Sequence, residues 1–322
     1  MKYIQNTLIL FSLFFLIGNT GCKTQGAGVK SDASTYKNEK ALLWKVTGKK
    51  VKKESYVFGT IHMIPSKDYF LPEYVDNALK SSDEVFFEIN TDDMNNPAMM
   101  MGMMNMMFME DKTLKDLLNE EDYKLVKEKL NDNPLMALLG EQADRIKPMF
   151  LSSMMDQGDM GIDPLSGGMD MGDMKSYEME LTKIAKAEGK PIDGLETLEF
   201  QMGLFDKIDL EDQAKMLVEA IRSEGEDEEG AEDTITKMVE LYKMQDVHAL
   251  YSMINAQSEG SGVSEFEDQF LTERNKNWIP LMAKTMSENT AFFAVGAGHL
   301  GGKQGVLELL RKEGYTVTPV LK

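Results

Sequence analysis

The hydrophobic positions of this chain form short runs near both ends and follow helical spacing in between. The short runs predict strands over residues 41–47, 55–61, 84–89, 190–195, 291–295 and 315–320. Helical spacing predicts helices over 72–80, 114–156 with a break at 144–148, 176–188, 197–205, 210–222, 233–243, 247–254, 265–286 and 305–312. The first two strands flank a basic turn and predict a hairpin.

Strands at both ends with helices between them predict an α/β (α+β) fold. We expect a mixed central sheet built from N- and C-terminal segments. A large helical insertion over about residues 94–290 would cover it, within a single domain spanning 41–322. Residues 157–175 are rich in Gly, Asp and Met without an apolar period, and they predict a loop.

The N-terminus reads as a targeting segment. Lys2, the apolar run 8–17 and the cysteine at position 22 resemble a bacterial lipoprotein signal, which predicts a signal peptide over 1–21 and lipidation of Cys22. Asn19 departs from the leucine usual three residues before that cysteine, so secretion and a retained anchor helix stay open as alternatives. Residues 22–40 are polar and predict a flexible tether.

Cysteine usage and charge narrow the class of protein. Cys22 is the only cysteine, which excludes an intramolecular disulfide and a cysteine-ligated zinc site. The net charge of −19 argues against nucleic acid as a partner and against docking on anionic lipid. Together these features predict an extracytoplasmic protein that is anchored to a membrane through its N-terminal lipid.

Two of the three histidines lie in matching local patterns at opposite ends of the chain. His62 ends a Gly-x-x-His segment after the run 56–58, and His299 ends another after 292–295. Each imidazole would emerge at the end of a strand, where α/β sheets present binding and catalytic groups. Glu88 stands near the end of the strand 84–89 and would face the same region. We therefore expect one site closed by two distant segments.

Several segments together resemble the TraB/GumN family, which includes the Tiki-type proteins. The resemblance rests on the runs 58–62, 194–197, 273–275 and 295–300, on the strand ending in Glu88, and on Gln201 and Trp278. It extends in order from about residue 41 to 322, although 157–175 aligns with nothing in the pattern. In Tiki-type members the two Gly-x-x-His motifs and a glutamate are associated with divalent-metal-dependent peptidase activity. More distant relatives include erythromycin esterase-like hydrolases and haem-binding lipoproteins.

The resemblance implies a hydrolase, and the residues suggest how it would work. His62, Glu88 and His299 are the ligand set that a divalent zinc, manganese or cobalt ion needs to activate water. The substrate would be a peptide or another small molecule with an amide bond. Two alternatives stay open: a non-catalytic lipoprotein that binds haem, a metal or a small ligand, and a metal-free esterase with histidine as general base. Both histidines could also merely cap strand ends.

Two further residues are candidates for the catalytic site. Glu196 follows a short strand and could orient other groups or act as an acid, or it could be a carboxylate favoured at a helix N-terminus. Arg274 lies on an amphipathic helix, where it would meet a carboxylate of the site or of the substrate, or form a structural ion pair. We expect Trp278 to be core and His248 to be uninvolved.

Two compositional features have plain explanations. Nine methionines between Met94 and Met109 predict an adaptable apolar helix over the cleft, although thioethers could also bind Cu(I). The acidic run 224–233 and the aspartates of 157–175 lack the alternation of a calcium loop. We expect both to be solvated connections.

Overall fold

The computed structural model describes residues 40–48, 51, 53–90, 92, 96–156, 173–223, 228–260 and 268–321. The predicted signal peptide, Cys22, residues 22–39 of the predicted tether and residues 157–172 of the predicted loop 157–175 lie outside these ranges. The end of that predicted loop is not a loop, because Met174 and Lys175 belong to the strand β5 (Met174–Ser176). Within them, no helix is both long and apolar enough to cross a membrane. The described chain forms two compact units, one drawn from residues 92–174 and 198–233 and the other from 40–91, 175–197 and 234–321.

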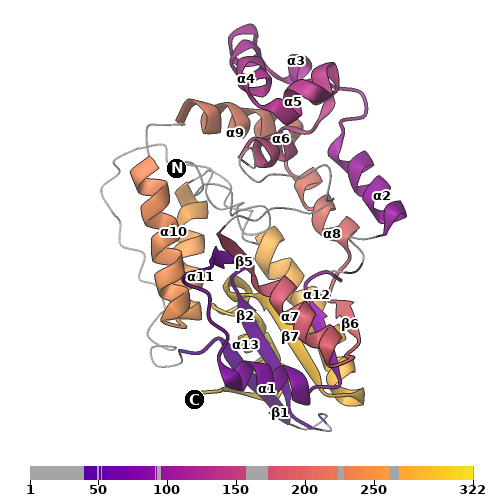
Figure 1. Ribbon diagram of the computed structural model, residues 1–322, viewed down its shortest axis with the longest axis vertical. Coiled ribbons are helices and arrows are strands. Elements are labelled where there is room, and N and C mark those ends of the chain that lie inside the picture. Colours follow the sequence, from indigo (N-terminus) through magenta and orange to yellow (C-terminus); the bar gives the residue numbers. More distant parts are fainter. Residues whose placement is uncertain are drawn as a thin grey trace. The chain divides into compact units, whose positions relative to one another are not determined.

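The second unit contains the central sheet (Figure 1). Its six strands are β1 (Leu43–Gly48), β2 (Ser55–Thr60), β4 (Glu84–Phe87), β6 (Ile192–Gly194), β7 (Ala291–Gly296) and β8 (Tyr315–Pro319), in the order β6-β4-β7-β2-β1-β8. The four strands from β6 to β2 are parallel, whereas β1 pairs antiparallel with both β2 and β8. The mixed sheet built from both chain ends and the hairpin β1–β2 are thus confirmed.

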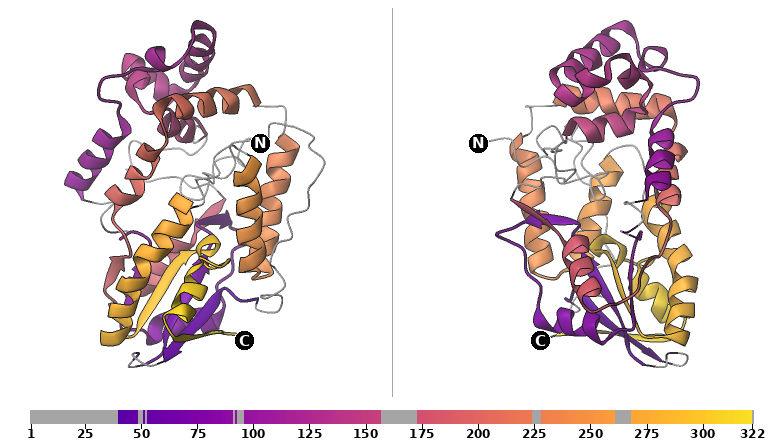
Figure 2. Two further views of the ribbon diagram at one scale, coloured as in Figure 1. Left: turned by 180° about the vertical axis from the view of Figure 1, so that it is seen from behind. Right: turned by 45° about the vertical axis from the view of Figure 1, so that its right-hand side comes forward.

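Helices cover both faces of this sheet. They are α1 (Glu73–Ser81), α7 (Tyr177–Ala187), α10 (Glu228–Lys243), α11 (Val247–Gly260), α12 (Glu273–Glu288) and α13 (Val306–Lys312). Helices α1 and α7 lie on one face, and α12 and α13 on the other (Figures 1 and 2). A π-helical turn, η5 (Asp268–Thr272), leads directly into α12, and a 3₁₀ turn, η6 (Ala297–His299), follows β7.

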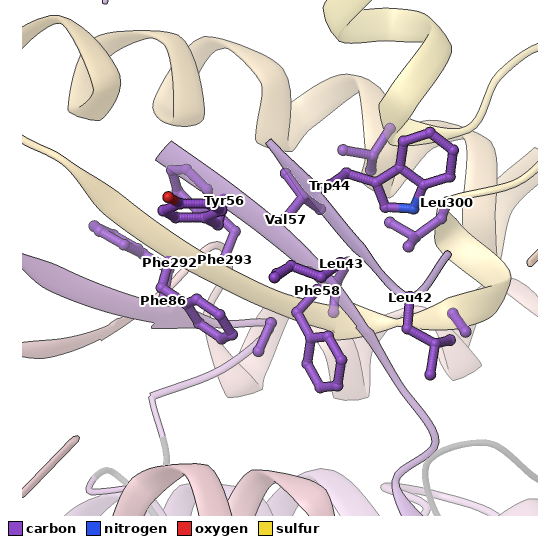
Figure 3. Close-up of a cluster of buried hydrophobic side chains, with 14 of the residues drawn as sticks. Leu42, Leu43, Trp44, Tyr56, Val57, Phe58, Phe86, Phe292, Phe293 and Leu300 are labelled. Atoms are coloured by element: carbon purple, nitrogen blue, oxygen red, sulfur yellow. The ribbon is translucent and has the colours of Figure 1, made fainter. Parts of the chain in front are cut away.

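The core consists of the side chains that the strands direct to both faces of the sheet (Figure 3). Phe58 of β2 packs toward Tyr177 of α7, with ring centroids 6.1 Å apart. On the opposite face, the Trp44 ring of β1 lies under the Arg311 guanidinium of α13. Every residue of β2 is buried, which explains its continuous apolar pattern, because a strand covered on both faces does not alternate.

A small two-stranded sheet sits beside the carboxyl end of β2. It pairs β3 (Met63–Pro65) with β5 (Met174–Ser176), and the Tyr177 N–H donates to the carbonyl of His62 over 3.2 Å. The strand β5 runs directly into α7. The first turn of α7 is therefore fixed next to His62.

The first unit is helical, as predicted for the insertion. It comprises α2 (Pro97–Met107), α3 (Leu114–Leu117), α4 (Glu120–Asp132), α5 (Pro134–Leu139), η3 (Gly140–Arg145), α6 (Pro148–Asp156), α8 (Leu198–Gly203), η4 (Phe205–Lys207) and α9 (Leu210–Ser223). The Met-rich helix is α2, with Met101 and Met104 exposed.

The acidic run 224–233 departs from its prediction as a solvated connection. Helix α10 begins at Glu228, so residues 228–233 are helical. Glutamate has good helix propensity, and negative side chains in a first turn interact favourably with the helix dipole. A dense acidic run is thus compatible with a helix start as well as with a connection.

Candidate active site

Four of the five predicted site residues follow the carboxyl ends of adjacent parallel strands. His62 lies just beyond β2, Glu88 beyond β4, Glu196 beyond β6 and His299 beyond β7. Because parallel strands end at one edge of their sheet, these side chains start close together. The fifth residue, Arg274, comes from the first turn of α12.

Gly296, the last residue of β7, marks the point where three of these groups meet. Its N–H donates to Glu88 Oε1 over 2.8 Å. A Cβ atom added to Gly296 would lie 3.2 Å from Glu88 Oε1, 3.5 Å from His299 Cδ2 and 3.7 Å from His62 Nε2. The structure therefore brings the two histidines from opposite chain ends to one place beside a glutamate.

His62 is held by the carboxylate of Glu178, which was not among the predicted site residues. Its Nδ1 lies 2.9 Å from Glu178 Oε1, which also accepts a hydrogen bond of 2.8 Å from the Thr60 hydroxyl. Glu178 sits in the first turn of α7, which β5 fixes beside His62. Because Nδ1 is bound in this way, the other nitrogen, Nε2, is the one on the Gly296 side.

The Glu178 carboxylate also controls the charge of His62. Burial by itself would lower the pKa of the imidazole, but attraction to Glu178 and their hydrogen bond outweigh it and raise the pKa from 6.5 to about 9. The side chain of His62 is 19% exposed, against 6% for His299. Of the two histidines, His62 is the one that solvent reaches.

Arg274 binds three of the other predicted site residues. Its Nε and Nη2 atoms donate to Glu196 over 2.9 and 2.6 Å, and Nη2 also donates to Glu88 Oε2. The Nη1 atom lies 3.1 Å from His299 Nε2. All of these side chains are nearly buried. Arg274 was expected to bind either a carboxylate of the site or a structural ion-pair partner. Glu88 and Glu196 are both, because they are site residues and also hold the arginine in place.

The surroundings of His299 fix its tautomer. An arginine can only donate, so His299 Nε2 accepts the Arg274 hydrogen bond and must be unprotonated. The proton sits on Nδ1, which donates to Asn275 Oδ1 over 2.7 Å. Burial, reinforced by the positive charge of Arg274, lowers the pKa of His299 to about 3. His299 is therefore neutral, and its one lone pair is in use.

The two carboxylates that share Arg274 differ in their electrostatics. Burial opposes ionisation of both, but Arg274, His62 and the Gly296 N–H hold the pKa of Glu88 well below its usual range. Burial dominates at Glu196, and its pKa is raised despite Arg274 and the Trp278 indole, which donates to it over 2.9 Å. Trp278 is core, as expected, and its ring also lies 4.5 Å from that of His299.

A comparison with models of protein families matches residues 42–319 to the TraB/PrgY/gumN family. The chain belongs to this family. The match includes both Gly-x-x-His segments and the segments that supply Glu88, Glu196 and Arg274, so the resemblance seen in the sequence is confirmed. Neither the curated proteins nor the solved structures searched contain a match to the chain.

The contacts of His62, Glu88 and His299 in this TraB/PrgY/gumN protein show whether these residues could bind a divalent ion together. The donor types suit a divalent ion, and His299 Nε2 lies 3.8 Å from Glu88 Oε1. Arg274, however, already binds both His299 Nε2 and Glu88 Oε2. Among the described residues, no three His, Cys, Asp or Glu side chains are grouped as an ion would need. With Arg274 in this position, the residues do not fit a three-ligand site.

Proposed function

We propose that this TraB/PrgY/gumN protein is a hydrolase that adds water to an ester, amide or peptide bond, with His62 as the general base. The observation that carries the proposal is the pairing of His62 with Glu178 at the carboxyl edge of the parallel sheet. The carboxylate orients the ring and stabilises its protonated form. The same arrangement of histidine and carboxylate serves proton transfer in unrelated hydrolases.

The chemical step needs only a water molecule and the substrate. The oxygen of the water attacks the carbonyl carbon while one of its protons passes to His62 Nε2. Glu178 stabilises the imidazolium that forms, across the hydrogen bond to Nδ1. The same proton then moves from Nε2 to the leaving oxygen or nitrogen as its bond to carbon breaks, which returns His62 to its neutral form.

The other site residues act by position. Gly296 brings the backbone of β7 close to His62 Nε2, because it has no side chain that would stand between them. Glu88 adds a negative charge near the ring, and this charge also favours the protonated imidazole. Arg274 holds Glu88 and Glu196 in place and keeps His299 neutral.

A divalent-metal-dependent hydrolase is the second candidate, and one observation favours it. Both imidazoles bind a polar side chain through Nδ1, Glu178 for His62 and Asn275 for His299. Metal-ligating histidines are typically anchored in this way by their second nitrogen. In this form His62, Glu88 and His299 would hold zinc, manganese or cobalt, which would make bound water acidic.

One experiment distinguishes a metal-free hydrolase from a metal-dependent hydrolase. The purified protein is freed of metal with a chelator and assayed on a panel of chromogenic esters, aryl amides and peptides, and its metal content is measured. If the hydrolase needs no metal, we expect hydrolysis to continue after treatment with the chelator. Loss of hydrolysis that zinc, manganese or cobalt restores would establish the metal-dependent form. If no substrate of the panel is hydrolysed under either condition, and a Soret band appears on haem titration, the protein is a carrier.

The substitution Glu178→Gln tests the control of His62. In the native protein we expect kcat/KM to rise about tenfold per pH unit up to about pH 9, because only the neutral ring accepts a proton. Glutamine removes the charge that raises the pKa of His62. The pH range in which kcat/KM rises should therefore shift to lower pH by about two pH units. The matched control is Glu180→Gln, since Glu180 lies on the same helix and pairs with Lys183. An unshifted pH range in Glu178→Gln would contradict the assignment.

The substitution Gly296→Ala tests whether the reaction takes place beside Gly296, next to His62 Nε2. Gly296 has φ −53° and ψ 135°, which alanine adopts without strain. The new methyl group would stand between Glu88, His62 and His299. We expect activity to fall by about 100-fold with little change in melting temperature, because a misplacement of 1 Å can cost that much. The control Gly203→Ala adds a methyl group in open space and should change neither quantity.

The N-terminal sequence pattern supports a further proposal, a lipid anchor at Cys22 on an extracytoplasmic surface. We expect Cys22→Ser to move the protein from the membrane fraction to the soluble fraction of a bacterial host that processes lipoproteins. Unchanged fractionation of the variant would contradict lipidation at this residue.

A further inference from the structure

The guanidinium of Arg274 uses every one of its N–H groups inside the site. One group on Nε and one on Nη2 bind Glu196, and the second on Nη2 binds Glu88. The two on Nη1 go to His299 Nε2 and to the carbonyl of Phe270, over 3.1 and 3.3 Å. Five donors with acceptors in a fork geometry make this a saturated cation site.

The frame around Arg274 restrains it in this position. Glu196 binds the guanidinium through two of its nitrogens and is itself held by the Trp278 indole N–H. The Trp278 ring lies against the guanidinium, 5.0 Å from its central carbon. The π-helical turn η5 supplies the Phe270 carbonyl from just before α12. Such turns recur at functional sites because they redirect backbone groups.

Arg274 also meets the electrostatic need that an ion would meet. The side chains of Glu88 and Glu196 are only 8% and 5% exposed, and carboxylates buried to this extent require a cation nearby to stay ionised. A divalent ion would need the lone pair of His299 and an oxygen of Glu88. The guanidinium binds both acceptors directly, so it and the ion compete for the same atoms.

We propose that Arg274 is the resident cation of this site, occupying the place that a divalent ion would take between Glu88, Glu196 and His299. The inference rests on the proposed function as a hydrolase without a metal ion, and it explains structurally why no ion would be needed. It also predicts that removing the guanidinium, with its charge balanced, turns the site into one that binds a divalent ion through His62, Glu88 and His299.

The test compares ion binding in charge-matched variants. The double variant Arg274→Gln with Glu196→Gln removes one positive and one negative charge and leaves the three donors in place. Glu196→Gln alone keeps Arg274 and is the matched control. Each purified, metal-free protein is titrated calorimetrically with Zn²⁺, Mn²⁺ and Co²⁺, and visible Co²⁺ absorption reports ligation by histidine. Cooperative thermal unfolding shows that each variant is folded.

We expect one ion per chain in the double variant, with an affinity at least about tenfold above the native protein and the control. Adding His299→Ala to the double variant should abolish this gain. Stoichiometric binding to the native protein that His299→Ala removes would overturn the inference, and so would a folded double variant without gain. If the double variant cannot be purified folded, Arg274→Met with Glu196→Gln replaces it, because methionine fills the space of the arginine stem without a charge; no gain there overturns the inference as well. None of these measurements uses a substrate, so absent hydrolysis would count against the proposed function alone.

Discussion

Replacing His62 with glutamine is expected to lower kcat/KM by about 10²–10⁴-fold on any substrate that the protein hydrolyses. Glutamine retains a polar side chain of similar reach, but it cannot accept the proton of the attacking water. The loss should fall on kcat, because no contact with substrate in the ground state is assigned to the ring. Steady-state kinetics at pH 9, where about half of the native rings are neutral, measures the difference.

The matched control for this substitution is His248→Gln, because this third histidine lies on helix α11 and does not follow a strand. It should retain native kinetics. A His62→Gln protein that keeps more than about a tenth of the native kcat would show that another group activates water. Restored activity of the variant at high pH, where hydroxide replaces the base, would in turn support the assignment.

Replacing Arg274 alone with glutamine is expected to lower the free energy of unfolding by about 3–5 kcal/mol. The change leaves Glu88 and Glu196 buried without their cation, and it removes the donor to His299. Chemical denaturation of the purified protein, followed by tryptophan fluorescence, measures the effect, since Trp278 packs on the guanidinium. We expect the double variant with Glu196→Gln to recover part of the loss, because one of the two unpaired charges is gone.

The control for burial is Arg222→Gln. Arg222 pairs with Asp122 on the surface, where its side chain is 53% exposed. Exposed ion pairs contribute only about 0–1 kcal/mol, so the change should be small. Equal destabilisation by Arg222→Gln and Arg274→Gln would mean that the buried network contributes no more than a surface pair.

The arrangement of the strands accounts for how much of the site could be predicted. His62, Glu88, Glu196 and His299 each follow a recognisable strand, and parallel strands end at one edge. Their convergence therefore needed only the hydrophobic pattern and one rule of α/β folds. The histidine that carries a charge could not be identified, because that depends on which cation or carboxylate each ring touches.

Glu178 and Asn275 were missed as partners for a different reason. Both lie in the first turn of a helix, where acidic and amide residues are common for capping and dipole reasons alone. Only the pairing of β3 with β5 brings Glu178 to His62. Such a non-local pairing leaves no local signal, although the motif that includes Asn275 contributed to the family resemblance. The central role of Arg274 also depends on tertiary contacts.

The pairing of β2 with β7 joins the two ends of the chain, with Tyr56 opposite Phe292 and Thr60 opposite Gly296. During synthesis, His62 therefore emerges long before the strand that completes its surroundings. Until β7 arrives, β2 has an open hydrogen-bonding edge and apolar side chains in water, which invites association with other chains. A product truncated before β7 would lack His299 and would be prone to aggregate, so the candidate site and the protection of this strand edge arise in the same late folding event.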